Sequence, residues 1–254
     1  MSAARPALLI AHRGDSSECP ENTRAAFDAA IAARVDGIET DLRLCADGVA
    51  VCHDATLERF GGSRLPLLRQ SAAALARADV GSWFHRRFRG EGVLGLDELL
   101  ARYARSATLL LELKPPAIGA ARRRALVART VAAIRAHGAR ERVRILCFDA
   151  AILRMVHRAD RRLALVLNRT RPPASFARVV ARAPWLGALD CDHRWLGPRT
   201  AEGCKQARRE LFTWSCNDAT AVARALALGV DGVLTDRPAW LDAAWKAGRA
   251  QPPQ

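Results

Sequence analysis

The stretch Asp36-Gly-Ile-Glu-Thr-Asp-Leu-Arg43 decides the fold of this chain. We interpret it as a buried strand, in which alternate side chains share a face, so that Glu39 and Asp41 point to the same side. Two neighbouring carboxylates on one face repel each other and lose hydration when they are buried. Such a pair is tolerable when a cation, a shared proton or an arginine lies between them. The pair therefore predicts a chemical site on a buried strand.

Polar side chains follow other apolar, strand-like runs in the same way. Glu112 and Lys114 share a face at the end of one run, His12 and Arg13 end another, and His53 follows a third. In a parallel α/β barrel the chemistry is kept at the C-terminal ends of the strands. The sequence therefore predicts a barrel whose site lies at that end.

Apolar, β-rich runs alternate with alanine-rich helical stretches along the chain. The expected strands cover residues 7–12, 36–42, 107–113, 143–148, 162–167, 186–190, 211–215 and 231–235. The expected helices cover residues 22–34, 96–105, 119–138, 150–159, 174–182, 198–209, 218–228 and 237–247. Eight strand-then-helix units predict the α/β class and a closed (β/α)8 TIM barrel, with residues 1–254 as a single domain. An open doubly wound sheet is the alternative, but no Gly-rich nucleotide loop follows the first strand.

A long segment, residues 43–95, interrupts the alternation between the second strand and the second helix. It begins as a hairpin, with Asp47 and Gly48 at the turn. Loop regions of this length are usually functional unless they form a small subdomain of their own. We expect an inserted small subdomain that roofs the C-terminal mouth of the barrel.

Composition narrows the class of protein further. A chain of 254 residues with 50% hydrophobic content can bury one large core. It contains no run of 18 or more apolar residues that would predict a membrane-spanning helix, and its beginning does not resemble a signal peptide. Its seven cysteines are odd in number and lack the paired spacing of zinc sites, which favours a reducing compartment. We therefore predict a cytoplasmic protein.

The net charge of +14 and the pI of 10.9 raise the question of nucleic-acid binding. Arginine supplies nearly all of this charge, because lysine occurs only at positions 114, 205 and 246. The arginines are scattered among alanines over helical segments, which indicates a coding bias rather than a binding groove. We do not expect nucleic acid as a partner. A basic surface does attract anionic substrates and allows transient contact with anionic membrane surfaces.

The ordered motifs resemble the glycerophosphodiester phosphodiesterase family from about residue 8 to residue 240. They are His12-Arg-Gly14, Pro20-Glu-Asn-Thr23, Asp36-Gly-x-Glu-x-Asp41, Asp47-Gly48, His53-Asp-x-x-Leu-x-Arg59, Gly81-Ser-Trp-Phe84, Leu96-Asp-Glu-Leu99, Glu112-Leu-Lys114, Trp214-x-x-Asn217 and Gly229-Val-Asp-Gly-x-x-Thr-Asp-x-Pro238. Each motif alone is weak evidence. Their order and spacing together are highly specific.

The resemblance implies a metal site and an acid–base pair. Glu39, Asp41 and Glu112 would hold one divalent cation. Three carboxylates with no cysteine or fixed histidine suit Mg²⁺ or Ca²⁺ rather than Zn²⁺. His12 and His53 would be the catalytic pair, one deprotonating the attacking oxygen and the other protonating the leaving alkoxide. Which histidine does which is left open.

The resemblance also implies three substrate-binding residues. Arg13 would fork onto two phosphate oxygens, and Lys114 would add a point charge or bind a glycerol hydroxyl. Trp214 would form a wall against the glycerol or alcohol group, the alternative being a place in the barrel core. Structural ion pairs are the alternative for Glu39 and Asp41 with Arg13 or Arg43, and for Glu112 with Lys114.

Other polar residues receive no committed role. Asp236, two residues before a proline, is typical of a helix N-cap. Glu21 could orient a site residue, and Asn217 could face the substrate or start a helix. Asp190 and Asp192 end the sixth expected strand and could line the mouth, but the resemblance assigns them nothing.

The function that the resemblance implies is metal-dependent hydrolysis of a small-molecule glycerophosphodiester to sn-glycerol 3-phosphate and an alcohol. One alternative is a lysophospholipase D or sphingomyelinase D type of activity on lipids, for which Trp83, Phe84 and Phe88 offer apolar surface in the insertion. A non-catalytic barrel that binds phosphodiesters is the other. The preferred alcohol, the choice of Mg²⁺ or Ca²⁺ and the oligomeric state are not determined by the sequence.

Overall fold

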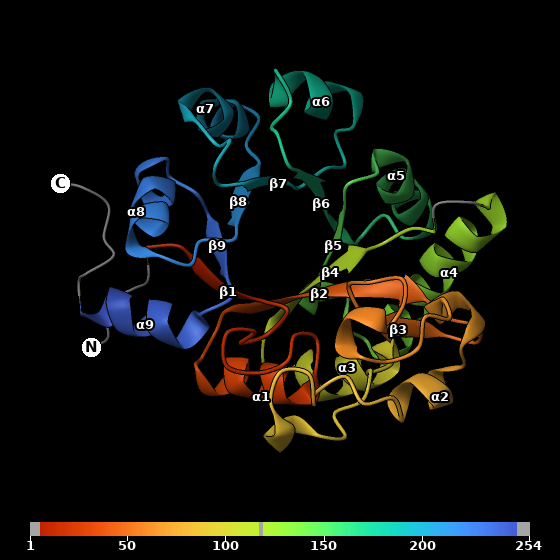
Figure 1. The fold of residues 1–254 in the computed structure, drawn as a ribbon. Helices are drawn as coiled ribbons and strands as arrows, with labels where there is room; N and C mark the ends of the chain where they lie inside the picture. Colours follow the sequence, from red (N-terminus) through yellow and green to blue (C-terminus); the bar gives the residue numbers. More distant parts are fainter. Residues whose placement is uncertain (1–5, 117–118, 248–254) are drawn as a thin grey trace.

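Eight parallel strands close into a ring in the computed structural model, which describes residues 6–116 and 119–247 (Figure 1). They are β1 (Leu8–His12), β2 (Gly37–Leu44), β4 (Thr108–Leu113), β5 (Val143–Cys147), β6 (Ala164–Arg169), β7 (Ala188–Asp192), β8 (Glu210–Trp214) and β9 (Gly232–Thr235). The hydrogen-bonded order is β1-β9-β8-β7-β6-β5-β4-β2, and β1 also pairs with β2, which closes the ring. The predicted TIM barrel is confirmed, and the open-sheet alternative is excluded.

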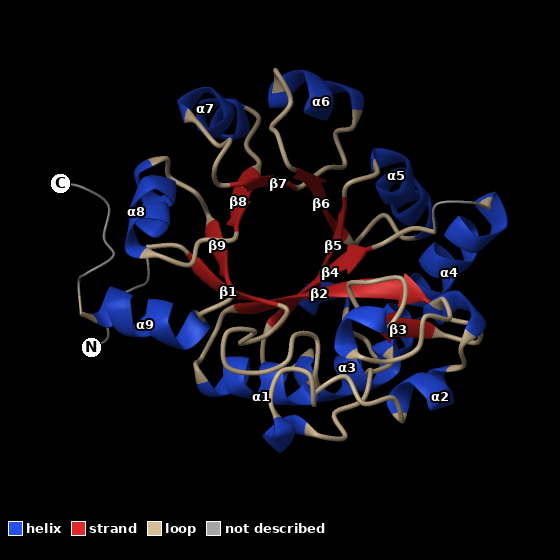
Figure 2. Cartoon of the chain, in the orientation of Figure 1, coloured by secondary structure: helices blue, strands red, loops and turns tan. Residues whose placement is uncertain are grey.

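Helices surround this ring on its outside (Figure 2). They are α1 (Arg24–Ala32), α3 (Leu96–Tyr103), α4 (Ala120–Ala136), α5 (Ala150–Ala159), α6 (Phe176–Arg182), α7 (Pro198–Gln206), α8 (Ala219–Ala227) and α9 (Pro238–Lys246), and a short 3-10 turn, η4 (Arg140–Arg142), precedes β5. Most of the observed helices are shorter than the predicted ones because caps and left-handed residues end them, whereas α5 has the predicted bounds. For example, α1 starts after Asn22, which has a φ of 59°, and after Thr23, whose side chain accepts from the backbone N–H of Ala26.

Two strands extend further into polar sequence than the apolar runs predict. The predicted strands 162–167 and 186–190 begin and end two residues later, as β6 and β7. Their pairing continues past the apolar residues, with Asn168 opposite Asp190 and Asp192 opposite Trp214. Hydropathy marks only the buried apolar part of a strand, whereas backbone pairing does not depend on polarity.

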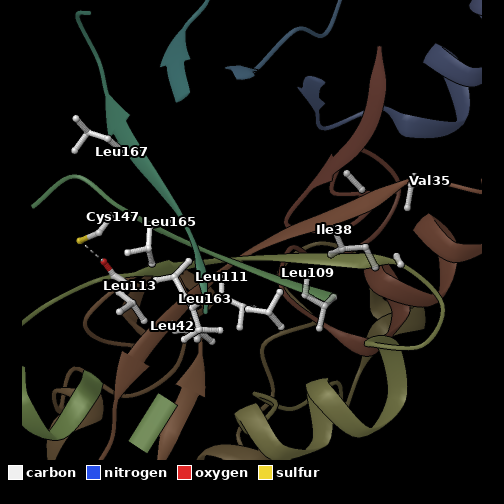
Figure 3. Packing of buried hydrophobic residues seen from close by; sticks show 14 of the residues in the cluster. Val35, Ile38, Leu42, Leu109, Leu111, Leu113, Cys147, Leu163, Leu165 and Leu167 are labelled. Carbon is white, nitrogen blue, oxygen red and sulfur yellow. Dashed lines mark hydrogen bonds between the residues drawn. The ribbon is translucent and has the colours of Figure 1, made fainter. Parts of the chain in front are cut away.

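The two faces of the strands build two apolar layers. Outward side chains pack toward the helices, and Figure 3 shows part of this layer, in which Leu109 and Leu113 of β4 lie near Ile38 and Leu42 of β2. The inward side chains that fill the centre of the barrel are Ile10, Leu110, Leu146, Val166, Ala188, Phe212 and Leu234. Two residues further along several strands, the inward side chains are His12, Glu112, Asn168, Asp190 and Trp214. The polar end of the barrel therefore lies on an apolar floor.

The insertion of residues 43–95 forms its own apolar cluster beside the barrel. The predicted hairpin is present, since β3 (Val49–Val51) runs antiparallel to the end of β2. The segment also holds α2 (Ala72–Ala76) and the 3-10 turns η1 (Glu58–Phe60), η2 (Leu67–Arg69) and η3 (Arg86–Phe88). Its cluster comprises Cys45, Ala50, Cys52, Leu57, Phe60, Leu67, Leu75, Val80 and Val93. In Figure 1 the insertion lies over α1 and α3, to one side of the ring; its role as a roof over bound substrate stays a prediction.

No helix in the described parts of the chain is both long and apolar enough to cross a membrane. The seven cysteines are buried free thiols. Burial raises the pKa of Cys52, Cys147 and Cys216 to about 12, so these thiols are poor nucleophiles near neutral pH.

Candidate active site

Three carboxylates from adjacent strands form the centre of the site. Glu39 and Asp41 come from β2 and Glu112 from β4, and each offers an oxygen within 4.8 Å of the others. The strand register explains this, because Asp41 lies directly opposite Glu112. All three are buried, and Glu39 Oε2 accepts no hydrogen bond from the described residues.

Two cationic side chains only partly compensate this charge. Arg13 Nε lies 3.1 Å from Asp41 Oδ2, and Lys114 Nζ lies 2.6 Å from Glu112 Oε1 and 3.1 Å from Asp41 Oδ1. Of the structural ion pairs considered from the sequence, those of Asp41 with Arg13 and of Glu112 with Lys114 are present. Because three carboxylates face two cations, one negative charge remains without a partner in the cluster.

The pKa values follow from this imbalance. Burial, and then the charges of the neighbouring carboxylates, raise the pKa of Glu39 well above its ordinary value and raise that of Glu112 as well. Burial also opposes ionisation of Asp41, but Arg13 and Lys114 outweigh it and hold the pKa of Asp41 below its usual range. The cluster must therefore take up a proton or a further cation. Closely spaced carboxylate oxygens are the donor set that a hard divalent cation prefers.

A hydrogen-bonded histidine lies on each side of the carboxylate cluster. His12, at the end of β1, has Nδ1 2.6 Å from Asp236 Oδ1 and Nε2 3.8 Å from Glu39 Oε2. His53 follows β3 and has Nδ1 2.7 Å from Asp54 Oδ1. Each aspartate accepts from Nδ1, so it selects the tautomer in which Nε2 is free for proton transfer.

A chain of ion pairs joins the insertion to the loop after β1. Arg59 Nε donates to Asp54 at 2.6 Å, and Arg59 Nη2 donates to Glu21 at 2.7 Å. Glu21 also accepts from Arg13 Nη1 at 3.0 Å. The orientation of His53 is thereby linked to that of Arg13 through three intervening side chains.

One cavity of about 250 Å³ collects these groups at the polar end of the barrel. It is lined by His12, Arg13, Glu39, His53, Glu112, Lys114, Phe148, Asn168, Asp190, Trp214, Ser215 and Leu234. Of the residues predicted for the site, Asp41 is not in this lining, because it lies buried behind Arg13 and Lys114. A larger, more open hollow of about 790 Å³ between α7 and α8 is lined by none of the predicted residues.

Comparison with known proteins assigns this arrangement to a family. A model of the glycerophosphoryl diester phosphodiesterase family matches residues 12–240. The chain belongs to this family. It is 31% identical to a glycerophosphodiester phosphodiesterase of Caldanaerobacter subterraneus subsp. tengcongensis, over 91% of this chain and 94% of that protein. The resemblance predicted from the motifs, and with it the enzyme class, is confirmed.

Solved structures agree with the fold of the family. A glycerophosphodiester phosphodiesterase from Agrobacterium tumefaciens has a TM-score of 0.80 at 25% identity, with 93% of this chain and 99% of that chain covered. A phosphodiesterase from Oleispira antarctica, solved in complex with sn-glycerol-3-phosphate, has a TM-score of 0.84 at 23% identity, with 92% and 95% covered. The barrel fold of this chain is therefore the same as that of these two structures.

Two aspartates at the site were not among the residues predicted for it. Asp236 is no helix cap, because the N-cap of α9 is Arg237, and its carboxylate instead contacts His12, Ser16 and Asn217. The sequence could have indicated the contact between Asp236 and His12, since a closed barrel places the end of the last strand beside that of the first. Asp54 adjoins His53 in the family motif, but only the fold shows that it contacts the Nδ1 atom.

Trp214 belongs both to the barrel core and to the wall of the cavity, the two places predicted for it. Its ring packs against the apolar cluster at the barrel centre and also lines the cavity, with the Phe148 ring centroid 6.2 Å away. Asn217 does not start α8, because Asp218 is the N-cap of that helix. Contact between Trp214 and a substrate stays a prediction.

Proposed function

We propose that this chain hydrolyses glycerophosphodiesters to sn-glycerol 3-phosphate and an alcohol, with one Mg²⁺ or Ca²⁺ ion bound by Glu39, Asp41 and Glu112. The observation that carries the proposal is the cavity in which two aspartate-bound histidines flank a buried carboxylate cluster with one uncompensated negative charge. The names of the relatives, and the product bound in the structure from Oleispira antarctica, support the substrate class.

The substrate phosphate would lie between the carboxylate cluster and the two basic side chains. When bound, the cation would supply positive charge to the phosphate oxygens. Arg13 would donate to two of these oxygens, and Lys114 would contribute a further charge. Both side chains line the cavity and are held in place by Asp41.

We assign the base role to His53. Burial lowers the pKa of His53 below its ordinary value, so the imidazole is neutral at pH 7 and can accept a proton at Nε2. It would take that proton from the attacking oxygen, which belongs to water or to the glycerol of the substrate. His12 would protonate the alkoxide oxygen as the bond between phosphorus and that oxygen breaks. If the glycerol hydroxyl attacks, water opens the cyclic phosphate in a second step with the roles reversed.

The test couples formation of glycerol 3-phosphate to its dehydrogenase, with glycerophosphocholine as substrate. We expect product with Mg²⁺ or Ca²⁺ and none in EDTA, with full recovery when the cation is restored. His12→Ala and His53→Ala should each lower turnover by about 10² or more while the protein stays folded. Full activity in EDTA would exclude the metal role, and unchanged turnover in either variant would remove that histidine from the mechanism.

Two exposed apolar side chains of the insertion favour lipid substrates as the second candidate. Leu65 is 43% exposed and Trp83 is 42% exposed. Several arginines lie near Trp83 in the sequence, so the insertion could contact an anionic lipid surface. Turnover of a lysophospholipid above that of glycerophosphocholine would favour this candidate. Binding of phosphodiesters without turnover by any metal-loaded sample would favour the non-catalytic barrel.

A further inference from the structure

Two buried polar side chains on the far wall of the cavity have no role in the mechanism proposed above. Asn168 of β6 and Asp190 of β7 lie directly opposite each other in the strand register, and both line the cavity. They are 2% and 1% exposed. Asn168 Oδ1 and both carboxylate oxygens of Asp190 accept no hydrogen bond from any described residue.

Such a pair destabilises the folded protein unless a molecule in the cavity donates hydrogen bonds to it. A buried polar group without a hydrogen bond destabilises the fold, because it has given up its hydrogen bonds to water. Beneath the pair lies the apolar floor, to which Val166 and Ala188 contribute from the same two strands. Because neither the floor nor the neighbouring strands donate a hydrogen bond to these oxygens, the cavity is the direction from which a partner can come.

The pair lines the same cavity as Glu39 and Glu112 of the carboxylate cluster, so one small ligand can contact both. Figure 1 shows β6 and β7 across the ring from β1 and β2, which carry His12 and Glu39. A ligand whose phosphate lies at the carboxylate cluster would extend toward Asn168 and Asp190. The part of the ligand that arrives there must offer hydrogen-bond donors.

We propose that Asn168 and Asp190 form a subsite for the terminal hydroxyl group of the glycerol moiety of the substrate. The proposal rests on the proposed function and deepens it by assigning which end of the diester enters the barrel. Hydroxyl groups both donate and accept, so they satisfy an amide oxygen and a carboxyl group at once. The alcohol beyond the phosphate would then leave toward solvent, where it makes few specific contacts.

Charge distinguishes glycerol from a cationic alcohol such as choline at this subsite. Burial, and then the charge of Glu112, raise the pKa of Asp190 well above its ordinary value, which favours the protonated carboxyl group. A neutral acid pairs with a hydroxyl group without the cost of burying a charge. The trimethylammonium group of choline has no hydrogen to donate and would leave all three oxygens without partners.

The experiment compares wild type with Asp190→Ala, Asp190→Asn and Asn168→Ala. The substrates are glycerophosphocholine, glycerophosphoethanolamine and bis(p-nitrophenyl) phosphate, which has no glycerol, and sn-glycerol 3-phosphate serves as a product inhibitor. We expect each alanine variant to raise KM for both glycerol diesters, and Ki for the product, by about tenfold, the loss of roughly one hydrogen bond. The values of kcat/KM for bis(p-nitrophenyl) phosphate should stay within twofold. Asp190→Asn should lie within about threefold of wild type, because an amide also donates and accepts.

Controls separate recognition from damage to the fold. Asp192→Asn changes a buried carboxylate of the same strand that is held by Arg194 and does not line the cavity. It should leave KM and Ki unchanged. Asp190→Ala should not lower the melting temperature, since it removes a buried polar group that has no partner.

Two results would overturn the subsite. An increase in KM confined to the choline and ethanolamine diesters, with an unchanged Ki for sn-glycerol 3-phosphate, would place the alcohol there instead. Unchanged values for every ligand would show that the pair recognises nothing. Failure of the proposed function would be recognised separately, because wild type itself would then convert no glycerophosphodiester, and the subsite would fall with it.

Discussion

Replacing Asp54 by asparagine tests whether the aspartate on His53 sets the tautomer needed for catalysis. In the native structure Asp54 accepts from His53 Nδ1 at 2.7 Å and from Arg59 Nε at 2.6 Å. An asparagine can present only one oxygen, so its amide nitrogen must face either His53 or Arg59. Arg59 is always a donor, whereas the imidazole can accept, so the amide N–H should turn toward His53 Nδ1. The histidine proton then moves to Nε2, where it blocks the base role.

The expected loss of activity follows from the hydrogen bond that Asp54→Asn removes. Loss of a hydrogen bond to a charged group costs about 1.5–3 kcal/mol, which corresponds to roughly 10- to 150-fold in rate. Because the wrong tautomer also removes the free Nε2, we expect kcat to fall by about 100-fold or more, with KM changed little. Removing Arg59 as well should let the asparagine turn its oxygen toward His53 and recover part of the loss.

The assay is the coupled formation of glycerol 3-phosphate from glycerophosphocholine at a saturating concentration of divalent cation. Glu58→Gln is the matched control, because Glu58 begins η1, shortly after Asp54 in the insertion, and pairs with Arg64 at the surface, 2.9 Å away. It should keep wild-type kcat. If Asp54→Asn retained kcat within threefold of wild type, Asp54 would not orient the base and the role of His53 would need revision.

Three further changes test the cation site and the fold. Glu112→Gln removes one of the three carboxylates, so the concentration of free cation that gives half activity should rise by about tenfold or more in a titration; an unchanged value would exclude Glu112 as a ligand. Hydrogen bonds from two arginines hold the pKa of Asp160 below its usual range, so this ion pair stabilises the protein above about pH 4 and is lost progressively as the pH falls. Asp160→Asn should therefore cost about 1–2 kcal/mol in urea unfolding at pH 7 and less at pH 3.5; an equal cost at both pH values would contradict the ionic origin. Gly14 has a φ of 85°, and a Cβ atom there would lie 2.6 Å from the backbone of Ala26, so Gly14→Ala should cost about 2 kcal/mol or more and lower the melting temperature by about 4–8 °C, measured by calorimetry.

Side-chain alternation made much of the barrel predictable from the sequence. Glu39 and Asp41 are two residues apart on one strand, as are Glu112 and Lys114 on the next, so each pair shares a face wherever the strand lies. The apolar runs likewise located all eight barrel strands, because burial on both faces demands them. Predictions failed by a residue or two where the polar ends of β6 and β7 continued the pairing beyond the apolar run.

Contacts between residues far apart in the sequence depended on the closed ring. Asp236 and His12 are separated by 224 residues, and they meet only because β9 pairs with β1. Asn168 and Asp190 belong to strands that no motif connects, and only their shared register reveals a pair without partners.

The sequence by itself determined the strand periodicity, the carboxylates and histidines of the site and the family, because these are local patterns whose spacing survives any arrangement of the elements. Only the tertiary structure decided which aspartate holds which histidine, how many charges the cluster leaves uncompensated and which buried oxygens face the cavity. Those properties depend on distances across the ring, which are set by barrel closure and by the position of the insertion on one side of it.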